Sequence, residues 1–229
     1  MEGKVVLVTG ADGGLGKYVT QSFLDAGATV IGTSRKVKQS DFSSPSFTAL
    51  PAEISTPEGA RLMVDQAVAR FGTLDVLAHT VGGFAGGQSI ADTDDATFRR
   101  MFDLNLNLLF HILRAAIPVL RKTGSGRIIA IGSRQALEPG AGVGAYSASK
   151  AAMVSLIRTV ALENKDAGLR ANVILPGTMD TPANRQAIPN ADFSKWVSPG
   201  AVASLITWLA SDTGKDVNGA VIPVYGGDV

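Results

Sequence analysis

Tyr146 and Lys150 are separated by one helical turn in sequence, which places a phenol and an ammonium on one face of a helix. Hydride addition to a carbonyl builds negative charge on the oxygen, so the reaction needs a proton donor there. A tyrosine has an ordinary pKa of about 10, and a nearby ammonium stabilises the phenolate and lowers that value. The pair therefore predicts proton transfer coupled to hydride transfer. The alternative is a half-buried tyrosine beside a surface lysine.

Ser133 precedes this pair and follows an apolar stretch, residues 128–131, and Gly132. In doubly wound sheets, ligands bind in the crevice outside the carboxyl ends of the strands. A hydroxyl at the end of such a strand faces the ligand. We therefore expect Ser133 to hydrogen-bond a carbonyl oxygen.

A glycine-rich turn over residues 9–16, Thr-Gly-Ala-Asp-Gly-Gly-Leu-Gly, lies between a predicted strand and a predicted helix. Without Cβ atoms the backbone turns tightly and approaches a pyrophosphate, which the following helix N-terminus attracts. A glycine-rich turn that binds nothing is the alternative. The residues predicted to contact the cofactor here are Gly10, Asp12, Gly13, Gly14, Leu15 and Gly16.

The end of the second predicted strand indicates which dinucleotide is bound. NAD sites of this type carry Asp or Glu there to bond the ribose hydroxyl, whereas this chain has Ser34, Arg35 and Lys36, followed by Lys38. Cations suit a 2′-phosphate, so we expect NADP(H) to be preferred over NAD(H). An ordinary solvated basic loop is the alternative.

Short apolar runs alternate with helix-length segments along the chain, a pattern typical of a parallel sheet covered by helices on both faces. The polar, Ser-rich stretch 36–46 is predicted to be a loop. The predicted strands are Val5–Thr9, Thr29–Thr33, Phe47–Leu50, Val76–His79, Arg127–Ile131, Arg170–Leu175 and Ala220–Val224. The predicted helices are Leu15–Ala26, Pro57–Phe71, Ala96–Leu120, Ala148–Asn164 and Ala201–Ala210.

The composition narrows the function classes. The chain has 229 residues, a formal net charge of +1, no cysteine and two histidines. These values predict no disulfide, no metal site and no nucleic-acid partner. No signal-peptide pattern and no uninterrupted apolar segment of about 20 residues is seen, so we expect a cytoplasmic protein of a single domain, residues 1–229, without a membrane partner.

Taken together, these motifs resemble those of the short-chain dehydrogenase/reductase family along essentially the whole chain. The phosphate turn is matched at Thr9, Gly10, Gly14 and Gly16, and the Tyr-x-x-x-Lys motif at Tyr146 and Lys150. Further matches are Ser133, Asn105, the Pro-Gly segment Pro176-Gly177, Thr181 and the closing pair Gly226-Gly227.

The resemblance implies a three-layer, Rossmann-type α/β fold with a parallel sheet of seven strands in the order 3-2-1-4-5-6-7. It implies that Tyr146 is the general acid/base, that Lys150 binds the nicotinamide ribose and tunes Tyr146, that Ser133 holds the substrate oxygen, and that Asn105 keeps a relay water in place. It adds further cofactor contacts at Glu53, Ile54, Thr80, Val81, Gly82, Pro176, Gly177, Met179 and Thr181.

The chain departs from the family pattern after the fourth strand, where His79-Thr80-Val81-Gly82 replaces Asn-Asn-Ala-Gly. We expect His79 to be a structural substitute for the first asparagine. The helix over 101–120 is apolar nearly all round, which with the resemblance predicts a homodimer or homotetramer.

The substrate remains open between three hypotheses. The intact catalytic set favours a small-molecule ketone or alcohol. Segments 82–87 and 180–196 resemble those of dihydropteridine reductases, which favours a quinonoid pterin, but that branch generally lacks the serine matched at Ser133. A dinucleotide-binding sensor without activity is the third hypothesis. Phe84 and Trp196 are candidates to flank a flat ring, and the link 178–198 is a candidate lid.

Overall fold

A central parallel sheet separates two helical layers in the computed structural model, which describes residues 1–227. The strands are β1 (Val5–Thr9), β2 (Thr29–Thr33), β3 (Phe47–Ala49), β4 (Val76–His79), β5 (Arg127–Ile131), β6 (Arg170–Pro176) and β7 (Val221–Val224). They form one seven-stranded sheet in the order β3-β2-β1-β4-β5-β6-β7, which confirms the predicted fold class.

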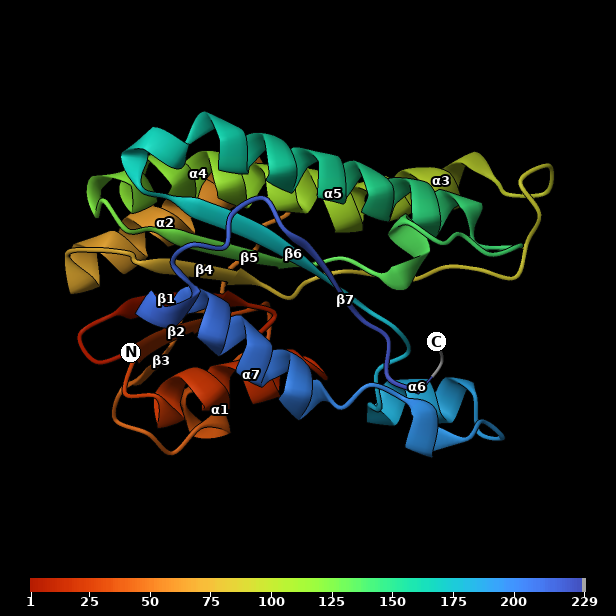
Figure 1. Cartoon of the computed structure of the whole chain (residues 1–229), viewed down its shortest axis with the longest axis horizontal. Coiled ribbons are helices and arrows are strands. Elements are labelled where there is room, and N and C mark those ends of the chain that lie inside the picture. Colours follow the sequence, from red (N-terminus) through yellow and green to blue (C-terminus); the bar gives the residue numbers. More distant parts are fainter. Residues whose placement is uncertain (228–229) are drawn as a thin grey trace.

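Each face of the sheet is covered because its strands are apolar on both sides. The helices on one face are α2 (Pro57–Phe71), α4 (Leu108–Lys122) and α5 (Gly144–Glu163); those on the other are α1 (Gly16–Asp25) and α7 (Pro199–Ala210). Figure 1 shows the two layers with the sheet between them, and the carboxyl ends of the strands toward the side of α6 (Pro182–Ala187).

The predicted helix over 96–120 is one continuous helical run with an irregular middle. It consists of α3 (Asp95–Phe102), a π-helical turn (Asp103–Asn107) and α4. By length and composition the run Asp95–Lys122 could cross a membrane, but α4 packs against α2 and α3 packs against α5. A π turn inserts one extra residue, and such turns are frequent at functional sites.

Two further predictions need correction. Helix α5 begins at Gly144, four residues before the predicted Ala148, so Tyr146 lies in its first turn. The link 178–198 contains α6 and a short 3₁₀ helix, Phe193–Lys195. Thr181 caps α6 by accepting a hydrogen bond from the backbone N–H of Asn184, a capping pattern of the Thr-Pro pair that the sequence already contained.

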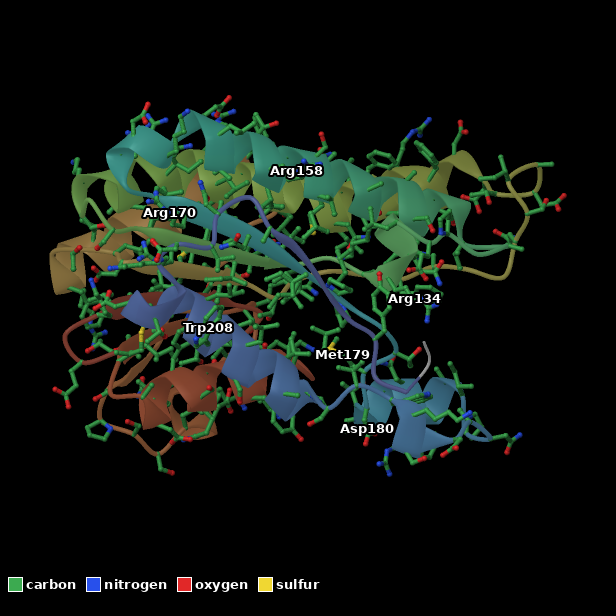
Figure 2. The ribbon with its side chains drawn as sticks, in the orientation of Figure 1. Arg134, Arg158, Arg170, Met179, Asp180 and Trp208 are labelled. Carbon is green, nitrogen blue, oxygen red and sulfur yellow. The ribbon has the colours of Figure 1, made fainter. Side chains whose placement is uncertain are left out.

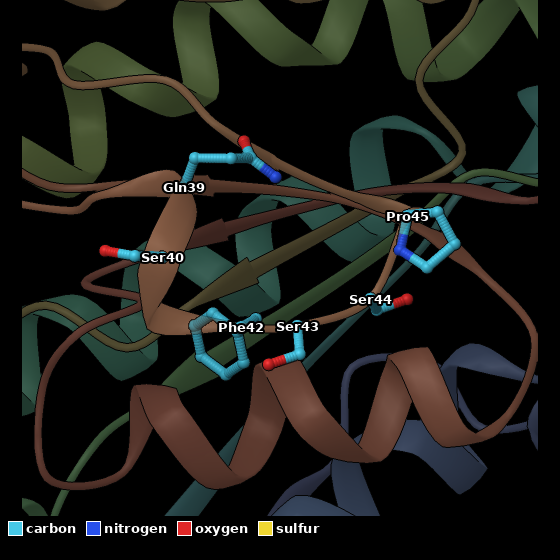
Figure 3. Close-up of a pocket in the computed structure, with 6 residues that line it drawn as sticks. All are labelled: Gln39, Ser40, Phe42, Ser43, Ser44 and Pro45. Carbon is cyan, nitrogen blue, oxygen red and sulfur yellow. The ribbon is translucent and has the colours of Figure 1, made fainter.

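The Ser-rich link 36–46 holds only the 3₁₀ helix Gln39–Asp41 among its described elements and is otherwise a loop, as predicted. Its Gln39 amide donates to the carbonyl of Phe47 and accepts from the N–H of Ala49, at 2.8 and 3.0 Å. Gln39 thereby occupies part of the open edge of β3. The surface hollow of Figure 3, lined by Gln39, Ser40, Phe42, Ser43, Ser44 and Pro45, lies on this loop and contains none of the predicted catalytic residues.

Candidate active site

The four predicted catalytic side chains come from the π turn, the segment directly after β5, and α5, near the carboxyl edge of the sheet. The Ser133 hydroxyl lies close enough to the Tyr146 phenol to lower the pKa of that phenol by hydrogen bonding. The Ser133 oxygen also accepts from the backbone N–H of Gln135 at 3.2 Å, which fixes the hydroxyl at the end of β5. Lys150 follows one turn after Tyr146 and is 4% exposed, and its ammonium donates to the carbonyl of Ile131 at 2.8 Å.

Asn105 is fully buried in the π turn and clamps a glycine loop. Its Oδ1 accepts from the N–H of Gly83 at 2.9 Å, and its Nδ2 donates to the carbonyl of the same residue at 3.0 Å. The Nδ2 group also donates to Ser149 at 3.0 Å, and the Ser149 hydroxyl donates to the carbonyl of Tyr146 at 2.7 Å. Asn105 thus connects the loop after β4 to the turn of α5 that carries the tyrosine.

Burial determines the electrostatics of the pair. It raises the pKa of Tyr146 above its ordinary value, and the hydrogen bond with Ser133 acts in the opposite direction. It also lowers the pKa of Lys150 to about 8. The expectation that Lys150 brings the tyrosine below its ordinary value is therefore wrong for this structure, because desolvation of the phenol is the largest effect.

The glycine turn meets two other predicted segments. Gly10 has a φ of +73°, and a Cβ built there would lie 3.0 Å from the Thr80 hydroxyl and 3.1 Å from Val81. A Cβ on Gly14 would lie 3.2 Å from the Thr181 methyl, and one on Gly16 would overlap the carbonyl of Gly10. The turn therefore leaves no room for side chains where it approaches the segments after β4 and β6.

A second glycine cluster lies beside Lys150 and Tyr146. A Cβ on Gly82 would be 3.0 Å from both the Lys150 ammonium and Asn105 Oδ1. Phe84, two residues later, meets Tyr146 edge-on with ring centroids 5.0 Å apart and is 66% exposed. Gly87 donates its N–H to the carbonyl of Gly142 at 2.9 Å, which pairs this loop with the loop before α5.

The remaining predicted cofactor contacts lie at the ends of β2, β3 and β6. Arg35 and Lys36 are exposed, and Ser34 accepts from the N–H groups of Lys36 and Val37 at 3.0 and 2.9 Å. Glu53 is exposed and accepts from its neighbour Ser55. Those on or near buried strand ends are Ile54, Pro176, Gly177 and Met179, and Asp12 is half-buried in the glycine turn.

Residues near the end of the chain contact both Arg134 and the link 178–198. Figure 2 shows Arg134, directly after Ser133, on the side of the molecule nearest α6. Its guanidinium lies over the Tyr225 ring at 4.8 Å and pairs with Glu138. Gly227 donates to the carbonyl of Lys195 at 2.9 Å. Trp196 packs on Phe193 within this segment, with centroids 4.8 Å apart, so its ring anchors the link.

Comparison with known proteins agrees with this arrangement. The sequence model described as short chain dehydrogenase matches residues 4–192. The chain belongs to the short-chain dehydrogenase family. It is therefore an oxidoreductase of the class that acts on CH–OH or carbonyl groups with a nicotinamide dinucleotide.

Relatives of this dehydrogenase act on different substrates. It is 28% identical over 245 aligned positions to 7alpha-hydroxysteroid dehydrogenase of Escherichia coli (strain K12), covering 100% of this chain and 95% of that protein. It is 28% identical over 242 positions to the 3-oxoacyl-(acyl-carrier-protein) reductase FabG of Thermotoga maritima, covering 99% and 98%.

Solved structures of the family superimpose closely on this dehydrogenase. ElxO with NADP bound has a TM-score of 0.92 at 26% identity, covering 99% of this chain and 98% of that one. A 3-ketoacyl-(acyl-carrier-protein) reductase from Brucella melitensis complexed with NADH has a TM-score of 0.88 at 26% identity, with the same two coverages. Both nicotinamide dinucleotides therefore occur on this fold.

Proposed function

We propose that this protein transfers hydride between NADP(H) and a small-molecule carbonyl or alcohol, with Tyr146 as the general acid/base. The observation that carries the proposal is the linked set of Asn105, Ser133, Tyr146 and Lys150 beside two glycine loops. The glycine turn leads directly into the N-terminus of α1, and a helix N-terminus preceded by a glycine-rich turn suits a dinucleotide phosphate.

The nicotinamide supplies the hydride in carbonyl reduction and accepts it in alcohol oxidation. In reduction the Ser133 hydroxyl donates a hydrogen bond to the substrate oxygen and keeps it beside the phenol. Tyr146 gives its proton to that oxygen as negative charge develops. The phenol of Tyr146, whose pKa burial raises, is protonated at neutral pH, as a tyrosine of ordinary pKa also is, and this is the form that reduction requires.

The remaining groups hold this geometry. Lys150 follows one turn after Tyr146 on α5, and its ammonium is fixed by the Ile131 carbonyl and can bond the ribose. Asn105 holds the Gly83 backbone in place through two hydrogen bonds. The exposed face of Phe84, which contacts Tyr146, favours an apolar or flat substrate.

The decisive experiment measures turnover of a panel of ketones and a quinonoid dihydropterin with NADPH and NADH. Tyr146→Phe should lower kcat for the accepted substrate by about 10²–10⁴-fold, because the proton donor is lost. Tyr18→Phe makes the same change on the half-exposed surface of α1 and should leave kcat unchanged.

Each result has a distinct meaning. Ketone turnover that survives Tyr146→Phe contradicts the proton-transfer role. Turnover of the pterin alone favours the pteridine-type reaction. Tight binding of NADPH with no turnover of any substrate favours the non-catalytic sensor.

The cofactor preference rests on Arg35 and Lys36, two exposed cations at the end of β2. Arg35→Asp should weaken NADPH binding by about tenfold or more and improve NADH binding, since a carboxylate repels the 2′-phosphate and bonds the ribose hydroxyl. Lys215→Asp reverses a charge at another exposed position and should leave the ratio of the two dissociation constants unchanged. Unaltered NADPH affinity in Arg35→Asp would overturn the assignment.

A further inference from the structure

His79 is a buried titratable residue that the mechanism above does not use. It ends β4, has no exposed surface, and stands where the family pattern has an asparagine. Its Nδ1 lies 2.9 Å from the Thr9 hydroxyl, which ties the end of β4 to the end of β1. Its Nε2 is also buried and has no hydrogen-bond partner among residues 1–227. Buried polar atoms of this kind call for a partner.

Lys150 lies in the same buried region. His79 pairs in register with Ala130 of β5, and the Lys150 ammonium donates to the next carbonyl, that of Ile131. Burial, together with the positive charge of Lys150, lowers the pKa of His79 to about 3. The polar groups in this region are the Thr9 hydroxyl from β1, which faces His79, and the ammonium of Lys150 from α5, which lies across Gly82 from the neutral Asn105 amide.

The field of Lys150 selects one tautomer of the neutral imidazole. A proton on Nε2 would place an N–H donor in the field of a buried cation, with nothing to accept it among the described residues. A proton on Nδ1 can instead be donated to the Thr9 oxygen, which leaves a lone pair on Nε2. The tautomer with the proton on Nδ1 is therefore the stable one.

We propose that His79 is a positioning residue for Lys150, acting through one buried water that accepts a hydrogen bond from the ammonium and donates one to Nε2. The ammonium has three donors, and the Ile131 carbonyl takes one of them. Buried waters commonly join buried polar groups that otherwise have no partner. The water-bridged acceptor stabilises the charged form of Lys150, so this inference rests on the proposed role of Lys150 in catalysis.

The tautomer can be measured without any substrate. In protein labelled with ¹⁵N-histidine, two residues contribute, and His111→Gln identifies the signals of His79. We expect the Nδ1-protonated tautomer at neutral pH, and a shift of the Nε2 resonance of several ppm in Lys150→Met, because the cation and its water bridge are gone. A proton on Nε2, or an Nε2 resonance that Lys150→Met leaves in place, would overturn the proposal.

The kinetic test compares pH profiles for carbonyl reduction. In His79→Leu the Lys150 ammonium loses its bridged acceptor, which lowers the pKa of Lys150. The activity of this variant should therefore begin to fall, as the pH rises, about one pH unit below the pH at which wild-type activity falls, and its kcat should be about tenfold lower. His79→Gln offers an amide oxygen as acceptor, so it should restore most of the wild-type pH profile and most of the wild-type kcat. The control Asn172→Leu removes a buried side chain of β6 that bonds Val217 and Ala220, and it should lower Tm without moving the profile.

The outcomes separate the two proposals. If His79→Leu lowers Tm but keeps the wild-type profile, His79 is structural and the positioning role is wrong. If the wild-type protein turns over no substrate, the proposed function fails, while the tautomer measurement still decides the placement of the proton on His79.

Discussion

The buried charge of Lys150 lowers the free energy of unfolding. Burial lowers its pKa to about 8, whereas the unfolded chain has the ordinary value of about 10.4. Between these values the unfolded chain binds a proton that the folded chain lacks, so stability rises with pH across this window. Below about pH 8 the buried ammonium remains charged, and its unfavourable contribution is fully present.

Replacing this lysine should therefore stabilise the protein while abolishing its activity. We expect Lys150→Met to raise the free energy of unfolding at pH 7 by on the order of 1–3 kcal/mol, and the gain to shrink toward pH 10.5. Urea unfolding at the two pH values measures both effects. Lys215→Met makes the same change at an exposed position and should alter stability by less than about 0.5 kcal/mol. Destabilisation by Lys150→Met at pH 7 would contradict this account.

The residue identities were readable from the sequence, but their proton affinities were not. The spacing of Tyr146 and Lys150 suggested that the ammonium governs the phenol, whereas desolvation dominates the pKa of both groups. Desolvation depends on what packs over a side chain, and much of that cover comes from distant segments. Phe84 on the Tyr146 ring is one such contact, made across 62 positions of sequence.

The two glycine loops beside the active site, one after β4 and one before α5, are joined by a backbone hydrogen bond between Gly87 and Gly142. Gly142 has a φ of +78° and accepts the N–H of Gly87 at 2.9 Å, next to the start of α5. A side chain at positive φ is strained by about 1 kcal/mol. The helix end at Gly72 has nearly the same φ, +76°, and an added Cβ there meets nothing within 4 Å.

These two glycines form a matched pair for experiment. Gly142→Ala and Gly72→Ala should each lower the free energy of unfolding by about 1 kcal/mol, which thermal unfolding measures. Gly142→Ala should in addition lower kcat several-fold, because the hydrogen bond between the two glycine loops positions the turn that carries Tyr146. Gly72→Ala should retain wild-type kinetics. If the two variants have equal kcat values, the hydrogen bond between the glycine loops does not position Tyr146 for catalysis.

Regular elements were predictable where the local signals are strong. The seven described strands lie within one residue of their predicted bounds, because each is a short, mainly apolar run with a polar or glycine residue next to at least one end. The start of α5 was missed because its N-cap residue, Val143, has no capping side chain, and α6 was missed because a helix of six residues has little periodicity. The π turn leaves no pattern that distinguishes it from the surrounding α-helix.

The helical layer formed by α3, α4 and α5 has large apolar side chains exposed on its surface. Phe98, Phe110 and Leu162 are 46, 42 and 71% exposed. We expect these helices to pack against a second copy of the chain, as the family resemblance implies. The predicted homo-oligomer would bury this face.

Light scattering at micromolar concentration tests that expectation. The wild-type protein should have at least the mass of a dimer, and Phe110→Glu should shift it toward the monomer, since a carboxylate at a packed interface is desolvated without a partner. Leu62→Glu places the same charge on α2, where the leucine is 59% exposed, and should leave the mass unchanged. A monomeric wild-type protein would refute the prediction.

The π turn within the run 95–122 also fixes how α3 and α4 are phased about their common axis. Each residue of an α-helix turns the chain by about 100°, so one surplus residue offsets everything before it by that angle relative to everything after it. Deleting a single residue between Asp103 and Asn107 would restore a regular helix and rotate α3 away from α5. It would also withdraw the Asn105 amide from Gly83. The length of this helix, counted in residues, is therefore as much a part of the active site as any side chain within it.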